Sequence, residues 1–284
     1  MRKSYAQLQR LAIAAFQHLE QEILLTEQQR HYLQRVLRLQ VGDQFIAITA
    51  TGWWLAELQS LQMAQLLQAI PVHTELPLAL TLLIALPKTG MDDVVRQATE
   101  MGVTTIQPIL SQRSFLNPSV QKLDRWRRIA QEAAEQSERQ MVPEVLPPLS
   151  WQEALQRWSV AQGVGYFCEA RGEYPHLLTC LLQKVGQWRQ GEPNTLGLPI
   201  EQETEVQPEK PGSEQVALPA SILVAVGAEG GWTPTELEQA IEAGYQPVTL
   251  GARIFRSVTA PLVALSVIAS VLEMMSLSTQ DWET

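Results

Sequence analysis

Two stretches of the sequence decide the fold class of this chain: VAVGAEGG at residues 224–231 and LGARIFRSVTAP at residues 250–261. In each of them, a glycine-bearing turn follows a short apolar strand and precedes the start of a predicted helix. Strands that alternate with helices form an α/β sheet, and such sheets bind ligands at the edge where their strands end. The two turns are therefore expected to lie on one edge of the sheet and to form one site.

The same alternation of strands and helices extends through most of the chain after residue 77. Thr233, Pro234 and Glu236 open one helix as its cap, its first-turn proline and its capping-box acid. This pattern predicts a mostly parallel sheet covered by helices on both faces. The predicted strands are 78–85, 105–110, 165–168, 222–226 and 247–250, and the predicted helices are 92–101, 122–139, 176–188 and 260–275.

Residues 9–70 have a different, β-rich pattern. Predicted strands are 10–16, 44–49, 53–58 and 64–70, of which the middle two form a hairpin. One helix interrupts them: Thr26 is its cap, Gln29 its capping-box partner, and His31, Arg35 and Arg38 follow as a row along it. The prolines between residues 71 and 77 mark the boundary, which gives expected domains 1–74 and 75–284.

Composition and charge narrow the functional class. The chain has 284 residues and a net charge of −9, but residues 191–219 alone carry six acids against one lysine. That segment is expected to be a disordered insertion or a long surface loop without chemistry. Residues 1–40 reverse the sign, with six basic against three acidic residues. This excess suits a nucleic-acid contact on one face, or simply a solvated charged surface.

Cysteine content and hydropathy bear on the compartment. Cys168 and Cys180 are the only cysteines, and they suggest neither a disulfide scaffold nor a metal site. The longest apolar run, 78–87, is too short to span a bilayer, and polar residues interrupt the N-terminal apolar stretch. We therefore expect a cytoplasmic protein without a membrane partner and without a bound metal.

The chemistry of the two glycine turns excludes the common phosphate loops. Neither Gly-Lys-Ser/Thr nor Gly-x-Gly-x-x-Gly is present, and Glu229 would repel a phosphate. Glycine backbone N–H groups can still serve a neutral or cationic ligand, although a plain tight turn also explains such glycines. Arg253 and Arg256 could hold a carboxylate or an RNA phosphate, stabilise a developing anion, or form a structural salt bridge with Glu229.

Several motifs in a fixed order carry a family resemblance. Besides the two opening stretches they are HYLQRVLR at 31–38, VGD at 41–43, TEMGV at 99–103 and AAEQSER at 133–139. Together they resemble the RsmE family of 16S rRNA uridine N3-methyltransferases, which belong to the SPOUT class of enzymes that use S-adenosyl-L-methionine (AdoMet). Only the segment 191–219 falls outside the resemblance.

The resemblance implies an N-terminal PUA-like β-barrel that binds RNA and an α/β methyltransferase domain with a C-terminal trefoil knot. It implies a homodimer acting on 16S rRNA, either free or within the small ribosomal subunit. Other possibilities are a SPOUT methyltransferase with a different RNA site or atom, and a catalytically weak RNA-binding factor for ribosome assembly. The implied AdoMet site consists of Val226, Gly227, Ala228, Glu229, Gly230, Gly231, Leu250, Gly251, Arg253, Ile254 and Phe255.

The resemblance also suggests roles for individual side chains. Arg256 is expected to stabilise the developing uracil anion or to fix its phosphate, and Glu229 is a candidate for proton handling. Positions that depart from the family pattern are Ala228 and Ala252 for proline, Phe255 for leucine, Ser257 for threonine, Val258 for glutamate and Glu138 for glycine. Loss of the acid at Val258 bears on catalysis rather than on a backbone-dominated cofactor site. The expected RNA contacts are Arg10, His31, Arg35, Arg38, Lys88, Arg113, Gln136 and Arg139.

Overall fold

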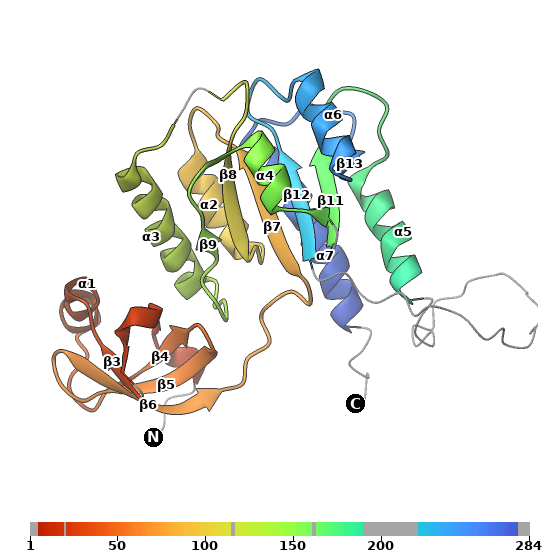
Figure 1. Cartoon of the computed structure of the whole chain (residues 1–284). Helices are drawn as coiled ribbons and strands as arrows, with labels where there is room; N and C mark the ends of the chain where they lie inside the picture. The colour runs from red at the N-terminus through yellow and green to blue at the C-terminus, as the bar shows by residue number, and fades with distance from the viewer. Residues whose placement is uncertain (1–4, 20, 115–116, 161–162, 190–220, 278–284) are drawn as a thin grey trace, which may run out of the picture.

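The computed structural model describes residues 5–19, 21–114, 117–160, 163–189 and 221–277. A small sheet from the N-terminal part and a larger α/β unit can be followed in Figure 1. The segment 191–219, predicted to be an insertion, lies outside the described residues. Among the described helices, none combines the length and the apolar character needed to cross a membrane.

The N-terminal sheet has six strands in the order β1-β4-β5-β6-β3-β2. Only β1 and β4 pair in parallel; the other neighbours are antiparallel. The predicted hairpin is confirmed as β4 and β5, but the predicted strand 10–16 ends at Ala12, and a 3₁₀ turn over Ala15–Gln17 follows it. The strand bounds are β1 Arg10–Ala12, β2 His18–Leu19, β3 Glu22–Leu24, β4 Gln44–Thr49, β5 Gly52–Leu58 and β6 Met63–Ile70.

Helix α1 (Glu27–His31) begins as predicted. Thr26 and Gln29 form both halves of a capping box, which satisfies N–H groups that the first turn leaves without partners. A π-helical turn over Tyr32–Val36 continues the chain, and Arg38 has a left-handed φ of 58°. The prediction that His31, Arg35 and Arg38 form one helical row is therefore wrong, because the wider turn and the reversal at Arg38 rotate them apart. All three remain exposed.

The larger sheet is entirely parallel, with β9 paired to β8 beside the strand order β10-β8-β7-β12-β11-β13. The predicted parallel sheet is thus confirmed. Strand bounds are β7 Ala79–Ala85, β8 Thr105–Leu110, β9 Glu144–Val145, β10 Leu149–Ser150, β11 Gly163–Cys168, β12 Ser221–Val226 and β13 Gln246–Val248. Helix bounds are α2 Met91–Glu100, α3 Val120–Gln136, α4 Trp151–Arg157, α5 Leu177–Arg189, α6 Pro234–Glu242 and α7 Ala260–Leu277.

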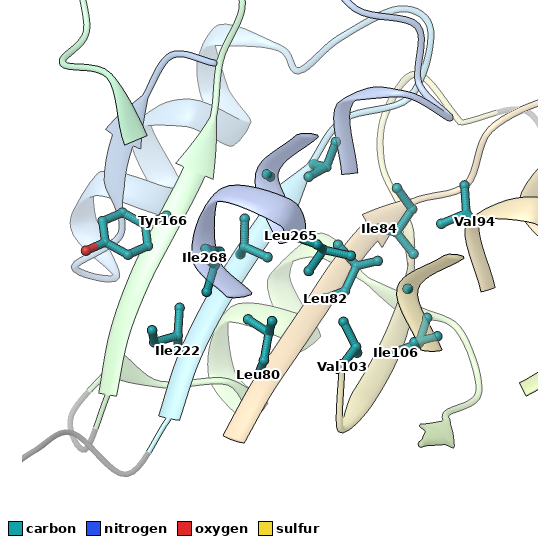
Figure 2. Close-up of a cluster of buried hydrophobic side chains, with 14 of the residues drawn as sticks. Leu80, Leu82, Ile84, Val94, Val103, Ile106, Tyr166, Ile222, Leu265 and Ile268 are labelled. Carbon is teal, nitrogen blue, oxygen red and sulfur yellow. The ribbon is translucent and has the colours of Figure 1, made fainter. Parts of the chain in front are cut away.

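Hydrophobic clusters cover both faces of this sheet. One joins the sheet to α2, α3, α5 and α7, and Figure 2 shows Leu80, Leu82 and Ile222 from the strands against Leu265 and Ile268 of α7. The other packs α4 and α6 on the opposite face. Each fully buried leucine or isoleucine contributes about 1.5–3 kcal/mol relative to an exposed one. Burial on both faces explains the continuous apolar runs of the central strands.

Helix α3 ends three residues before the predicted end at 139. Glu138 has a φ of 58°, a left-handed conformation that helices rarely tolerate. Glycine adopts this conformation without strain, which gives a physical reason for the glycine usual at this position in the resembling family. The chain turns there toward the N-terminal sheet.

The two parts of the molecule meet at this end of α3, and Arg139 is the centre of the contact. Its side chain is only 3% exposed; Nη2 lies 2.5 Å from Glu75 Oε2, and Nη1 donates to the carbonyl oxygens of Thr99 (2.6 Å) and Val103 (3.1 Å). The Trp53 indole N–H donates to the carbonyl oxygen of Arg139 at 2.9 Å. The predicted RNA contact at Arg139 is wrong because these partners occupy its guanidinium inside the protein.

Arg10 belongs to the same contact. Its side chain is 11% exposed and pairs with Glu138 at 2.9 Å, and its guanidinium carbon lies 4.9 Å from the centroid of the Trp53 ring. A bond from the Ala12 N–H to Glu135 Oε1 (2.8 Å) continues the contact along α3. Arg10 was also predicted to contact RNA; its burial between the two parts contradicts that prediction.

Candidate active site

Three loops converge where neighbouring strands β12, β11 and β13 end. They surround a cavity of about 820 Å³ at the carboxyl edge of the sheet, which is the upper edge in Figure 1. This is the edge at which parallel α/β sheets bind ligands. All of the residues expected to hold the cofactor line this cavity: Val226, Gly227, Ala228, Glu229, Gly230, Gly231, Leu250, Gly251, Arg253, Ile254 and Phe255.

Close packing explains the glycines of the first loop. A Cβ atom on Gly227 would lie 3.1 Å from the Trp232 indole nitrogen, and one on Gly230 would lie 3.0 Å from Arg113 Cβ. The Arg113 guanidinium donates to the carbonyl oxygens of Gly230 (2.6 Å) and Trp232 (3.0 Å). Arg113 thus stabilises the glycine loop by these two hydrogen bonds. Its predicted role as an RNA contact stays a prediction.

Glu229 connects two loops of the site. Its carboxylate accepts the backbone N–H of Lys88, at 3.0 Å and 3.2 Å from the two oxygens, and so ties the loop after β7 to the loop after β12. None of the ion pairs among the described residues joins it to Arg253 or Arg256. The structure therefore gives Glu229 a positioning contact, and its part in proton transfer stays a prediction.

Arg253 and Arg256 are both exposed and both line the cavity. The Arg253 guanidinium carbon lies 6.0 Å from the centroid of the Phe255 ring. The Arg256 carbonyl oxygen accepts the N–H groups of Thr259 and Ala260, each at 2.9 Å, at the start of α7. The backbone of Arg256 is thus anchored, whereas its guanidinium makes no hydrogen bond or ion pair within the part of the chain that the structure describes.

The sequence missed the third loop of the site. Cys168, the last residue of β11, and residues 169–171 after it line the cavity beside the predicted loops. Strand β11 lies between β12 and β13 in the sheet. Burial, with repulsion from Glu169, raises the pKa of Cys168 to about 12, so its thiol stays protonated and serves as a wall of the cavity. The only sequence signal was a strand that ends at Cys168, and the strand order needed to interpret it is not a local property.

Val258 lies where the cavity approaches helix α2. A Cβ atom on Gly90, the residue that caps α2, would come within 2.7 Å of Val258 Cγ1, and Gly90 has a left-handed φ of 83°. The apolar side chain that departs from the family pattern is therefore packed against this glycine. Its packing shows that valine fits the position structurally.

This contact predicts a destabilising substitution. Gly90→Ala is expected to lower the free energy of unfolding by about 1–3 kcal/mol, because it combines a backbone strain with the clash against Val258. Urea denaturation of Gly90→Ala and of the double variant Gly90→Ala/Val258→Ala measures both components. In the double variant, the smaller side chain at position 258 should remove the steric clash that Gly90→Ala introduces, and leave only the backbone strain at position 90. Equal stability of wild type and Gly90→Ala would contradict the described contact.

Comparison with known proteins agrees with this geometry. Residues 74–269 match the RNA methyltransferase domain family, and residues 25–69 match the RNA methyltransferase PUA domain family. The parallel sheet, the three-loop cavity and these matches define an RNA methyltransferase with an N-terminal PUA domain.

Comparison with two related proteins identifies the family within this class. The chain is 41% identical over 274 residues to the ribosomal RNA small subunit methyltransferase E of Synechocystis sp., covering 95% of this chain and 80% of that protein. It is 28% identical to the protein of that name from Bacillus subtilis, over 88% of this chain and 91% of that one. The chain belongs to the ribosomal RNA small subunit methyltransferase E family, as its motifs predicted.

A solved structure supports the same assignment. The ribosomal RNA small subunit methyltransferase E from Neisseria gonorrhoeae, bound to S-adenosyl methionine, is 27% identical with a TM-score of 0.69. The match covers 93% of this chain and 98% of that chain. The likeness therefore extends over both parts of the molecule.

Proposed function

We propose that this chain transfers the methyl group of AdoMet to N3 of one uridine in 16S rRNA. The observation that carries the proposal is the cavity formed by the loops after β11, β12 and β13 in a member of this family. The proposed domains are an RNA-binding part, 1–74, and a methyltransferase part, 75–284. The trefoil knot stays part of this proposal.

The residues of the cavity fit an AdoMet molecule. A volume of about 820 Å³ lies in the usual range for small-molecule sites, roughly 300–1,000 Å³. The buried indole N–H of Trp232 has no hydrogen-bond partner among the described residues. Unsatisfied buried donors are costly, so a ligand with acceptor atoms would stabilise this site.

The side chains at the mouth of the cavity suit methylation of an imide nitrogen. AdoMet supplies an electrophilic methyl group; the uridine must lose its N3 proton and align that nitrogen with the methyl carbon. Arg256 would stabilise the negative charge that spreads onto the uracil oxygens. Glu229 holds the adjoining loop and could take up the proton. Because N3 lies on the Watson–Crick edge, the uridine must be unpaired or extruded.

Exposed polar residues provide contacts for the RNA. His31, Arg35 and Arg38 lie on the N-terminal part, and Lys88 and Gln136 lie on the larger part. Such contacts position RNA through its phosphates rather than by its sequence.

The proposed homodimer has support in exposed apolar side chains. Leu178 and Leu182 on α5 and Met274 on α7 are exposed, and these two helices pack against each other. A contact between two copies would remove this apolar surface from water. The proposed setting is the cytoplasm, where the rRNA substrate would be available.

Transfer of labelled methyl groups tests the activity. Wild-type protein, with labelled AdoMet, should label 16S rRNA or small subunits that lack the modification, and should leave 23S rRNA unlabelled. Gly251 has a φ of 121° and lines the cavity, so Gly251→Val should abolish labelling and calorimetric AdoMet binding together. RNA binding and AdoMet binding without transfer would contradict the proposal and favour the assembly factor.

A further inference from the structure

A second cavity, of about 500 Å³, lies beside the proposed cofactor cavity. Four cationic side chains line it, Lys88, Arg96, Lys122 and Arg125, against the two carboxylates of Asp92 and Asp93, which leaves a formal excess of two positive charges. We call it the basic cavity. Thr89 lines both cavities, so the two adjoin each other at the loop between β7 and α2.

Internal contacts hold the wall of the basic cavity in place. The carboxylate of Asp92 accepts the Trp126 indole N–H at 3.1 Å and Nε of Arg125 at 2.8 Å. The ammonium of Lys122 lies 5.9 Å from the centroid of the Trp126 ring. The Arg125 side chain is 63% exposed although its Nε and Nη2 pair with Asp92. Lys122 and Arg125 are therefore held on helix α3 by contacts with its neighbours.

The basic cavity lies far from the candidate RNA contacts of the N-terminal part. It lies at the start of α3, whereas the N-terminal part contacts the end of α3 through Glu135. The 17 residues of that helix extend about 25 Å, at about 1.5 Å per residue. Figure 1 shows the N-terminal sheet at the lower end of α3 and the strand ends at the upper end. The basic cavity thus adjoins the proposed cofactor cavity, whereas the N-terminal part contacts the other end of α3.

We propose that the basic cavity binds a backbone phosphate of the substrate RNA, next to the uridine that enters the cofactor cavity. Lys122 and Arg125 would act as positioning residues: they would hold the neighbouring nucleotide and so orient the reacting base. Two excess positive charges favour a phosphate and disfavour a neutral ligand or a cation. The proposal rests on the proposed function for its substrate, since the phosphate belongs to the RNA that carries the reacting uridine.

Lys122→Ala tests the proposal, with Arg128→Ala as the matched control. Arg128 is an exposed residue on the same helix that lines neither cavity. We expect Lys122→Ala to raise the dissociation constant for 16S rRNA, measured by filter retention with S-adenosylhomocysteine present, by about five- to twenty-fold. The slope of log affinity against log salt should fall by about 0.7, the value for one phosphate contact on a single strand. Arg128→Ala should change neither by as much.

Two further readouts decide the outcome. AdoMet affinity by calorimetry should stay within about twofold in Lys122→Ala, and Lys122→Arg should retain most of the RNA affinity. An effect of Lys122→Ala no larger than that of Arg128→Ala would overturn the proposal. So would a loss of AdoMet affinity with unchanged RNA affinity, because the cavity would then serve the cofactor. Since RNA retention needs no methyl transfer, failure of the proposed reaction remains distinguishable from failure of this site.

Discussion

Replacing Arg256 with alanine should lower kcat for rRNA methylation by about 10²–10³, the loss typical of removing one donor that stabilises a developing anion. The Arg256 backbone is anchored at the start of α7, and its exposed side chain lines the cavity. Its guanidinium has no hydrogen-bond or ion-pair partner in the described part of the chain. Alanine would therefore remove the positive charge and the hydrogen-bond donors offered to the anion without breaking a hydrogen bond or ion pair of the fold. Single-turnover transfer from labelled AdoMet measures the loss.

Arg253→Ala is the control for this prediction. Arg253 lies three residues earlier in the same loop, next to the Phe255 ring, and carries the same charge. Its loss should cost at most about tenfold in kcat, because Arg253 is expected to hold the cofactor rather than the developing anion. AdoMet affinity should stay within about threefold in Arg256→Ala. If that variant binds AdoMet and turns over at a rate within threefold of wild type, Arg256 has no catalytic role.

Replacing Arg139 with methionine should lower the free energy of unfolding by about 3–5 kcal/mol, because it leaves Glu75 without its buried partner. The guanidinium makes hydrogen bonds to Glu75, Thr99 and Val103, which lie on the linker and at the end of α2. Methionine fills part of the volume but donates to none of these oxygens. Thermal and urea unfolding, followed by circular dichroism, measure the loss.

Arg128→Met is the matched control for that loss. Arg128 is exposed on α3, and the same substitution there should change stability by less than about 0.5 kcal/mol. The double variant Arg139→Met/Glu75→Gln should be more stable than Arg139→Met alone, since the unpaired carboxylate is gone. Similar losses at Arg139 and Arg128 would show that the buried pairing of Arg139 with Glu75 adds nothing to stability.

Features fixed by neighbouring residues could be predicted from the sequence. The capping boxes at Thr26 and Thr233, the hairpin around Gly52 and the glycine turns after β12 and β13 all depend on residues within a few positions of one another. The parallel sheet followed from the alternation of strands and helices. A ligand site at the edge of the sheet was predicted because both of its glycine turns are visible in the sequence, whereas its assignment to AdoMet came from the family resemblance.

Features that depend on distant residues could not be predicted. The loop after β11 joins the site because β11 pairs with both β12 and β13, and the pairing of distant strands leaves no local signal. Arg10 and Arg139 have the composition of RNA contacts, and only the fold brings Glu138 and Glu75 against them. The predicted helical row of His31, Arg35 and Arg38 was wrong because a π-helical turn and a left-handed residue interrupt the helix.

Identification of the methylated nucleoside tests whether this chain methylates N3 of a uridine in 16S rRNA. 16S rRNA or small subunits that lack the modification would be incubated with this protein and labelled AdoMet, digested to nucleosides and analysed by mass spectrometry. We expect labelled N3-methyluridine derived from a single position. Label in any other methylated nucleoside, or no label while calorimetry shows bound AdoMet and a control enzyme is active, would contradict it.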